Sequence, residues 1–121
     1  MALKTKTTNV YYYALIKQLR KVSRENKAKI WRYVAELLDR PRRKRVIVNL
    51  SKINRLTKEG DTVVVPGKVL AGGDLTHPVT IAAYAFSEKA KEKITKAKGR
   101  AISILELVKE NPKGSNVKII I

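Results

Sequence analysis

Five cations lie within six residues in the segment Arg40-Pro41-Arg42-Arg43-Lys44-Arg45. A guanidinium group presents a planar fork of N–H donors that matches the oxygens of a phosphate, and each phosphate contact releases a condensed counterion. A lone run of this kind is usually just a solvated stretch of charge. Because the surrounding sequence is also basic, we interpret this run as a loop that binds nucleic-acid phosphates, through Arg40, Arg42, Arg43, Lys44 and Arg45.

A second set of cations repeats at helical spacing. Apolar residues predict an amphipathic helix after Asn9, a plausible N-cap, with Tyr12, Leu15, Ile16, Leu19 and Val22 on its inner face. The opposite face carries Lys17, Arg20, Lys21 and Arg24. Like charges three and four residues apart destabilise a helix slightly, and no acid in this stretch relieves them. A phosphate backbone alongside the helix would relieve them.

The overall charge of the chain favours the same interpretation. The 121 residues contain 27 Lys and Arg against 10 Asp and Glu, a formal net charge of +17. The first 58 residues hold 17 of these cations and only three acids, so the first half is the predicted docking half. A compact domain with this excess repels itself unless a polyanion is beside it. Nucleic acid is the first candidate partner, and an anionic membrane surface is the second.

Further contacts are predicted at the N-terminus and at one turn. Residues 1–8 should form a flexible basic arm in which Lys4 and Lys6 become ordered on RNA. The segment Val65-Pro66-Gly67-Lys68 is not a phosphate-binding P-loop, because the first glycine of that motif is missing. It predicts a turn, with Lys68 as an additional RNA contact. Tyr11 or Tyr13 could stack on bases, whereas Tyr12 and Trp31 fall on apolar faces and are expected in the core.

No set of residues indicates catalysis or metal binding. The chain has no cysteine, and His77 is its only histidine, so a metal site or a catalytic triad is not expected. The acids Glu59, Asp61 and Asp74 show no spacing typical of paired carboxylate chemistry. We therefore expect no enzyme activity, no cofactor and no small-molecule substrate. The chain also lacks a signal-peptide-like start and any apolar stretch near the roughly 20 residues that a membrane-spanning helix needs.

The elements that position these residues alternate along the chain. A second helix, capped by Asn26, should end at Pro41, and the basic loop should follow it. The remaining predicted elements are a buried strand at Val46–Val48, a short helix starting at Asn49 or Ser51, a strand at Thr62–Val65 that Pro66-Gly67 stops, a possible third strand at Lys68–Leu70, a strand at Val79–Phe86, a helix capped by Ser87, a helix with a Ser103/Glu106 capping box, and a strand at Val117–Ile121. This pattern predicts an α/β fold with N-terminal helices. We expect one domain over residues 9–121, with a basic helical part at 9–45 and an α/β part at 46–121.

Several segments together resemble a known family of ribosomal proteins. Leu37-Leu38-Asp39-Arg40-Pro41-Arg42-Arg43 and Val48-Asn49-Leu50-Ser51-Lys52-Ile53 resemble the signature of the archaeal and eukaryotic "eighteen-e" family of the large subunit. Val63-Val64-Val65-Pro66-Gly67-Lys68-Val69-Leu70 is similar to a second hallmark, and Val79–Ala83 and Asn111–Val117 match as well. The resemblance runs from about Asn9 to the C-terminus. Val46 departs from it, since a smaller residue is expected after the basic loop.

The resemblance implies both a fold and a role. It implies an irregular ββα superhelix preceded by helices, related to the bacterial "fifteen" family of large-subunit proteins. It implies a structural protein that binds large-subunit ribosomal RNA, lies beside other ribosomal proteins in the cytoplasm, and supports subunit assembly and translation. The short chain suggests an archaeal member. From composition alone, a DNA-binding or chromatin protein fits equally well, and an RNA-processing enzyme with an unrecognised site also stays open.

Overall fold

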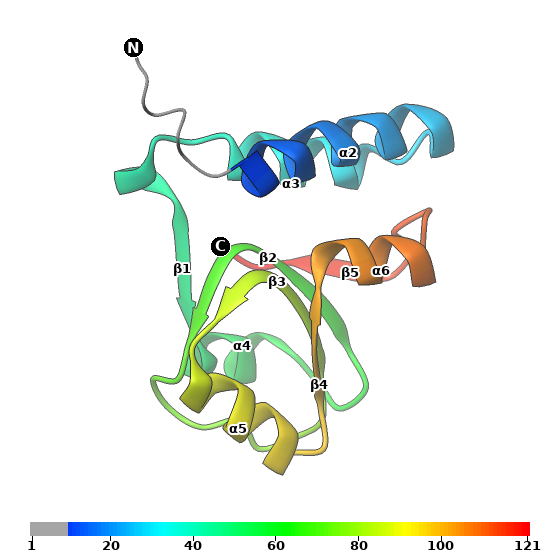
Figure 1. Cartoon of the computed structure of the whole chain (residues 1–121). Coiled ribbons are helices and arrows are strands. Elements are labelled where there is room, and N and C mark those ends of the chain that lie inside the picture. Colours follow the sequence, from blue (N-terminus) through cyan, green and yellow to red (C-terminus); the bar gives the residue numbers. More distant parts are fainter. Residues whose placement is uncertain (1–9) are drawn as a thin grey trace.

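A five-stranded sheet forms the centre of the computed structural model, which describes residues 10–121 (Figure 1). All paired strands are parallel, in the order β1-β2-β3-β4. The fifth strand, β5, pairs with the first residues of β2, and β1 pairs with the last residues of β2 along the same edge. The strands are β1 (Val46–Asn49), β2 (Thr62–Leu70), β3 (Thr80–Phe86), β4 (Arg100–Ser103) and β5 (Val117–Ile119).

Helices cover both faces of this sheet. One face packs against α2 (Val10–Asn26), α3 (Lys29–Leu38) and α6 (Ile104–Glu110), and the other packs against α4 (Leu50–Leu56) and α5 (Glu88–Lys96). In Figure 1, α2 and α3 lie side by side above the sheet, and α4 and α5 lie below it. A short 3-10 turn, η1 (Arg42–Lys44), connects α3 to β1. The predicted α/β class with N-terminal helices is confirmed.

Two buried aromatic residues hold the helix pair together and attach it to the rest of the molecule. Trp31 has no exposed surface, and its Nε1 donates a hydrogen bond of 2.7 Å to the carbonyl of Pro112, 81 residues away. The Tyr12 hydroxyl donates to the carbonyl of Leu38 at the end of α3. The expected core positions of both residues are confirmed. The expected cap at Asn26 was wrong, because Asn26 is the last residue of α2 and its side-chain amide donates back to the carbonyl of Val22.

Strand β2 passes through the proline and glycine that were expected to stop it. The prediction of separate strands at Thr62–Val65 and Lys68–Leu70 was wrong, because one strand spans Thr62–Leu70. Pro66 and Gly67 together lie opposite the single residue Tyr84 of β3, which makes a β-bulge. Pro66 also has no register partner in β1 or β5, so the N–H group that proline lacks is not needed there.

The remaining elements differ from their predictions in two places. Ser87 accepts a hydrogen bond from the backbone N–H of Ala90, and Ser103 and Glu106 form the expected capping box. Strand β4, by contrast, was not predicted, because only Ile102 of its four residues is buried and no alternation marks it. Strand β1 was expected to be buried throughout, but Ile47 is 63% exposed. The arm at residues 1–8, with Lys4 and Lys6, lies outside the described residues.

The carboxylate of Asp61 gives the fold a pH dependence. It accepts hydrogen bonds from the backbone N–H of Lys58 at 2.9 Å and from Lys118 Nζ at 3.0 Å, which ties β5 to the start of β2. The bond from the Lys58 backbone, followed by the bond from Lys118, lowers the pKa of Asp61. A lowered folded-state pKa contributes stability above the unfolded-state pKa, and this contribution is lost as the pH falls through the folded-state pKa.

Asp61→Asn is therefore expected to lower the Tm near neutral pH, and the difference from wild type should shrink below about pH 4. Thermal unfolding of both proteins across this range measures the effect. Asp74→Asn is the control, because the Asp74 side chain is 85% exposed and its contact with Lys93 is 3.8 Å long. A Tm difference for Asp61→Asn that is the same at pH 3 and pH 6 would contradict the assignment.

Candidate nucleic-acid interface

The outer face of α2 presents a row of cations to solvent. Its inner face is buried in the core, and this fixes Lys17, Lys21 and Arg24 on the outside. Among the described residues none of these three has an ion-pair partner. Arg20 does have an acidic partner, which comes from outside this stretch: its Nη2 lies 3.1 Å from Oδ2 of Asp39, just after α3. The interhelical contact thus neutralises one of the four predicted cations.

The basic loop is a short, ordered turn between α3 and β1. Helix α3 ends at Leu38, and the backbone N–H of Lys44 donates to the carbonyl of Pro41 at 2.8 Å. Arg40, Arg43 and Lys44 are exposed, and Arg42 is the first residue of η1. The loop lies at the same end of the helix pair as the start of α2, because Tyr12 of α2 contacts Leu38 at the end of α3. The hydrogen bond from Lys44 folds the loop backbone into a turn, so the loop is not extended.

Arg45 has a structural role within this loop. Its guanidinium carbon lies 4.0 Å from the centre of the Tyr12 ring, a cation–π contact, and its Nε donates to the carbonyl of Arg40 at 3.4 Å. Burial raises the pKa of the Tyr12 hydroxyl, and Arg45 offsets part of that rise. Tyr12 in turn meets Tyr84 of β3 edge to face, with 4.8 Å between the ring centres. Arg45 thus anchors the end of the loop onto α2 and β3.

The fold brings Lys68 close to Arg45, although 23 positions separate them in the sequence. Lys68 is exposed on β2, where it is the register partner of Ile47 in β1 and of Ala85 in β3. Together with Arg45 these residues line a pocket of about 290 Å³, whose other lining residues are Tyr12, Val46, Gly67 and Tyr84. We name it the β1–β3 pocket. Arg45 and Lys68 are the two predicted RNA contacts that the pocket brings together. The cations of α2 and the rest of the loop lie on other surfaces.

Two residues of the β1–β3 pocket were not predicted to take part in binding. Ile47 was expected to be buried, and Tyr84, which is 37% exposed, was assigned only to a strand. One signal was available for Ile47: the sequence Val46-Ile47-Val48-Asn49 is short enough for its residues to alternate between two faces. No sequence signal marked Tyr84, because its position depends on the bulge opposite it.

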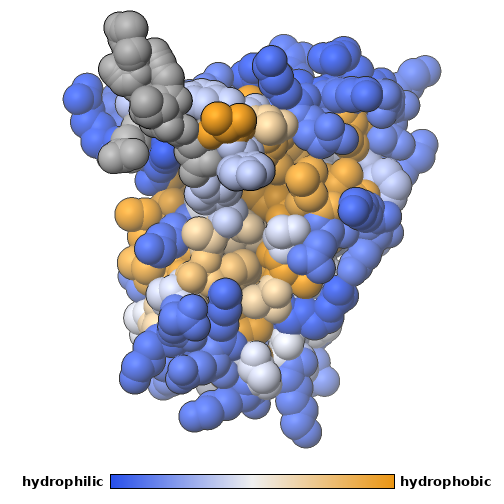
Figure 2. Space-filling model, in the orientation of Figure 1, coloured by the Kyte–Doolittle hydropathy of each residue, from blue (hydrophilic) through white to orange (hydrophobic). Residues whose placement is uncertain are grey.

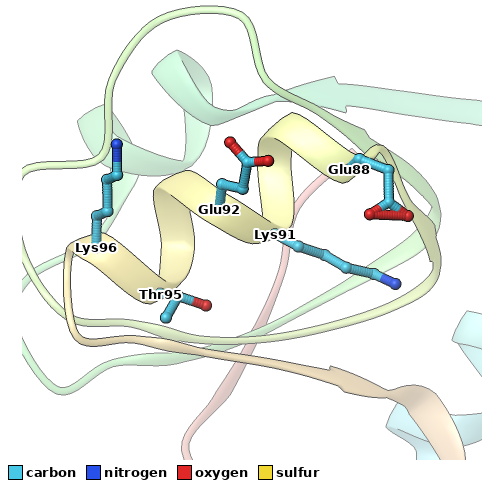
Figure 3. Close-up of a pocket in the computed structure, with 5 residues that line it drawn as sticks. All are labelled: Glu88, Lys91, Glu92, Thr95 and Lys96. Carbon is cyan, nitrogen blue, oxygen red and sulfur yellow. The ribbon is translucent and has the colours of Figure 1, made fainter.

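Other hollows in the described surface do not gather catalytic groups. A depression of about 400 Å³ is lined by five side chains of α5, Glu88, Lys91, Glu92, Thr95 and Lys96. Figure 3 shows them spread along one side of the helix and pointing in different directions. Within residues 10–121, no group of His, Cys, Asp and Glu could hold a metal ion, and no helix has the length and apolar character needed to cross a membrane. His77 lies in a loop, with Nε2 at 2.8 Å from Oγ1 of Thr57.

These features define a small, strongly basic α/β protein with cations displayed on a helix pair and a loop. Comparison with known proteins identifies its family. The family model described as "Ribosomal protein 60S L18 and 50S L18e" matches residues 2–121. The chain therefore belongs to this family, whose members are structural proteins of the ribosome and not enzymes.

Archaeal relatives match over almost their full length. The chain is 51% identical to the large ribosomal subunit protein eL18 of Pyrobaculum aerophilum over 117 residues, which cover 97% of this chain and 96% of the relative. It is 47% identical to the eL18 protein of Methanothermobacter thermautotrophicus over 120 residues, 99% of each chain. The eL18 protein of Methanoregula boonei is 52% identical over 113 residues, 93% of each. The predicted family resemblance is confirmed.

Proposed function

We propose that this protein is a structural constituent of the large ribosomal subunit that binds large-subunit ribosomal RNA through Arg and Lys contacts to the phosphate backbone. Its partners are then this RNA and neighbouring ribosomal proteins, and its location is the cytoplasm, within the large subunit. Bound in this way, the cations neutralise closely spaced phosphates and let RNA segments approach each other. The protein thereby supports subunit assembly and translation.

The observation that carries the proposal is a set of exposed cations on α2 and in the loop that have no ion-pair partner among the described residues. Lys17, Lys21 and Arg24 on α2 are exposed and without ion-pair partners among residues 10–121, and the exposed cations of the loop lie beyond α3. The exposed face of α5 is the internal comparison, since it mixes two glutamates with its lysines. Unrelieved like charge is what a phosphate backbone would stabilise.

Phosphate contacts of this surface would suit folded RNA as well as they suit duplex DNA. An A-form helix has a deep, narrow major groove that side chains cannot read, so proteins bind it mainly through phosphates, 2′-hydroxyls and shape. Rows of cations on a helix and a short turn supply contacts of this kind. The family membership favours ribosomal RNA over chromatin as the partner.

Co-sedimentation and competition test the proposal. The protein should remain with the large ribosomal subunit through a moderate salt wash of native extract, and large-subunit RNA should displace a labelled RNA fragment from it more effectively than duplex DNA does. Release from the subunit at moderate salt, or equal competition by DNA, would contradict it. Incubating the purified protein with the RNA tests the enzyme alternative, for which cleavage or modification of the RNA is the predicted result.

A further inference from the structure

The β1–β3 pocket combines an apolar floor with two cations, and no acid lines it. Its lining residues are Tyr12, Arg45, Val46, Ile47, Gly67, Lys68, Tyr84 and Ala85. Isolated apolar residues are common on protein surfaces. Here, however, an isoleucine that is 63% exposed and a tyrosine that is 37% exposed converge on one hollow. The space-filling view shows a broad apolar band between the helix pair and α5, with hydrophilic residues above and below it (Figure 2).

The walls of the pocket are held in place by the fold. The register of β1, β2 and β3 places Ile47, Lys68 and Ala85 in one row across the sheet. Tyr84 lies at the bulge of the same sheet, where its ring meets Tyr12. Arg45 is fixed over the Tyr12 ring at 4.0 Å. The hollow therefore does not need to form when a ligand arrives.

We propose that this pocket receives the base of one unpaired nucleotide of the bound RNA, with Lys68 and Arg45 beside its phosphates. The inference rests on the proposed function. Each base of an RNA strand is a flat apolar ring attached to a backbone of anions, and this matches an apolar hollow rimmed only by cations. A volume of about 290 Å³ is at the lower end of ligand pockets, so it suits one base better than a larger ligand.

The location of the pocket supports a nucleotide over a peptide. Arg45 belongs both to the pocket and to the basic loop, so a strand whose phosphates lie along the loop passes the mouth of the hollow. Bases inside an A-form helix cannot leave the stack without cost, so the occupant is a nucleotide from a bulge, loop or strand end. An acidic peptide would satisfy the cations but would not cover the exposed side chain of Ile47 with an apolar ring.

Salt titration separates base insertion from phosphate contact. Affinity for a large-subunit RNA fragment is measured against salt concentration for wild type and for Ile47→Ser. Loss of an apolar contact with a base should lower the affinity about tenfold at every salt concentration and leave the log–log slope unchanged. Lys68→Gln should instead reduce the slope by a little under one.

Leu105→Ser and Lys109→Gln are the matched controls, because this leucine and lysine line a second apolar hollow of about 370 Å³ between α2 and α6. They should leave the RNA affinity close to wild type. If the plot of log affinity against log salt for Ile47→Ser coincides with that of wild type, the proposal is overturned. An equal loss of RNA affinity with Leu105→Ser would overturn it as well. If Ile47→Ser binds naked RNA normally but releases from subunits more easily, the pocket binds a protein instead.

Ultraviolet cross-linking of the wild-type complex gives a test that needs no variant. The proposal predicts a nucleotide adduct on the peptide that contains Tyr84. Adducts that map only to other peptides would overturn it. Failure of the wild-type protein to bind RNA would instead remove the proposed function, and the pocket proposal would fall with it.

Discussion

Neutralising six exposed cations should remove most of the salt dependence of RNA binding. The variant carries glutamine at Lys17, Lys21 and Arg24 of α2 and at Arg40, Arg43 and Lys44 of the loop. Each lost phosphate contact reduces the slope of log affinity against log salt by about 0.7–0.9, so the slope should fall by about 4–5 if all six touch phosphates. The slope is measured by filter binding of a large-subunit RNA fragment between about 50 and 200 mM salt. Over this range, a protein that makes about 6–10 phosphate contacts loses about 10³–10⁵ in affinity.

The choice of these six residues follows from the structure. Arg45 is excluded because it contacts the Tyr12 ring, and Arg20 because it pairs with Asp39, so replacing either would also disturb the packing of the helix pair. The matched control removes six exposed cations from the other half of the chain, Lys89, Lys91, Lys96, Lys98, Lys109 and Lys113. Both variants have the same net charge.

The comparison between the two variants decides between a local interface and a general effect of charge. If the control lowers the slope as much as the six-cation variant does, the net charge of the chain drives binding and no surface is specific. Two further variants replace only the three α2 residues or only the three loop residues. Their slopes show how much each surface contributes to the salt dependence. A loop variant with the wild-type slope would show that the loop is not a phosphate site.

Sequence periodicity was sufficient for the elements that depend on local chemistry. Helix α2 begins at Val10, after Asn9, and its buried face contains the five apolar residues that the spacing selected. Ser87 and the Ser103/Glu106 box depend on contacts three residues apart, so their roles could be predicted directly. Strand β4 could not be predicted, because the pairing of Arg100–Ser103 with β3 is a tertiary contact. The role of Asn26 was also missed, because its amide donates back to Val22 within α2 instead of capping the next helix.

The site was predictable in charge but not in geometry. The cations of α2 and the loop follow from composition and spacing, and the structure leaves most of them exposed as expected. The pairing of Arg20 with Asp39 joins residues 19 positions apart, and the contact of Arg45 with Tyr12 crosses from the loop to α2. Such contacts give a cation a role in packing in addition to any contact with RNA. No pattern within a single element reveals them.

Gly67→Ala is expected to unfold the protein at a much lower temperature than wild type. A Cβ atom at this position would lie 2.0 Å from the carbonyl oxygen of Val46 in β1, which is backbone and cannot rotate away. Overpacking of this kind costs about 1–3 kcal/mol, and a clash between paired strands should reach at least the upper end of that range. For a domain near 100 residues this corresponds to a drop in Tm of more than about 10 °C.

Gly60→Ala is the control that separates a steric clash from backbone strain as the cost of replacing a glycine in this fold. Gly60 has a φ of +86°, but a Cβ there would meet no atom within 4 Å, so only the backbone strain of about 1–2 kcal/mol applies. Gly67 has no positive φ, so only the clash applies. Thermal unfolding followed by circular dichroism compares them. A smaller drop for Gly67→Ala than for Gly60→Ala would mean that β1 and β2 separate easily at the bulge, and that the β1–β3 pocket they frame is not rigid.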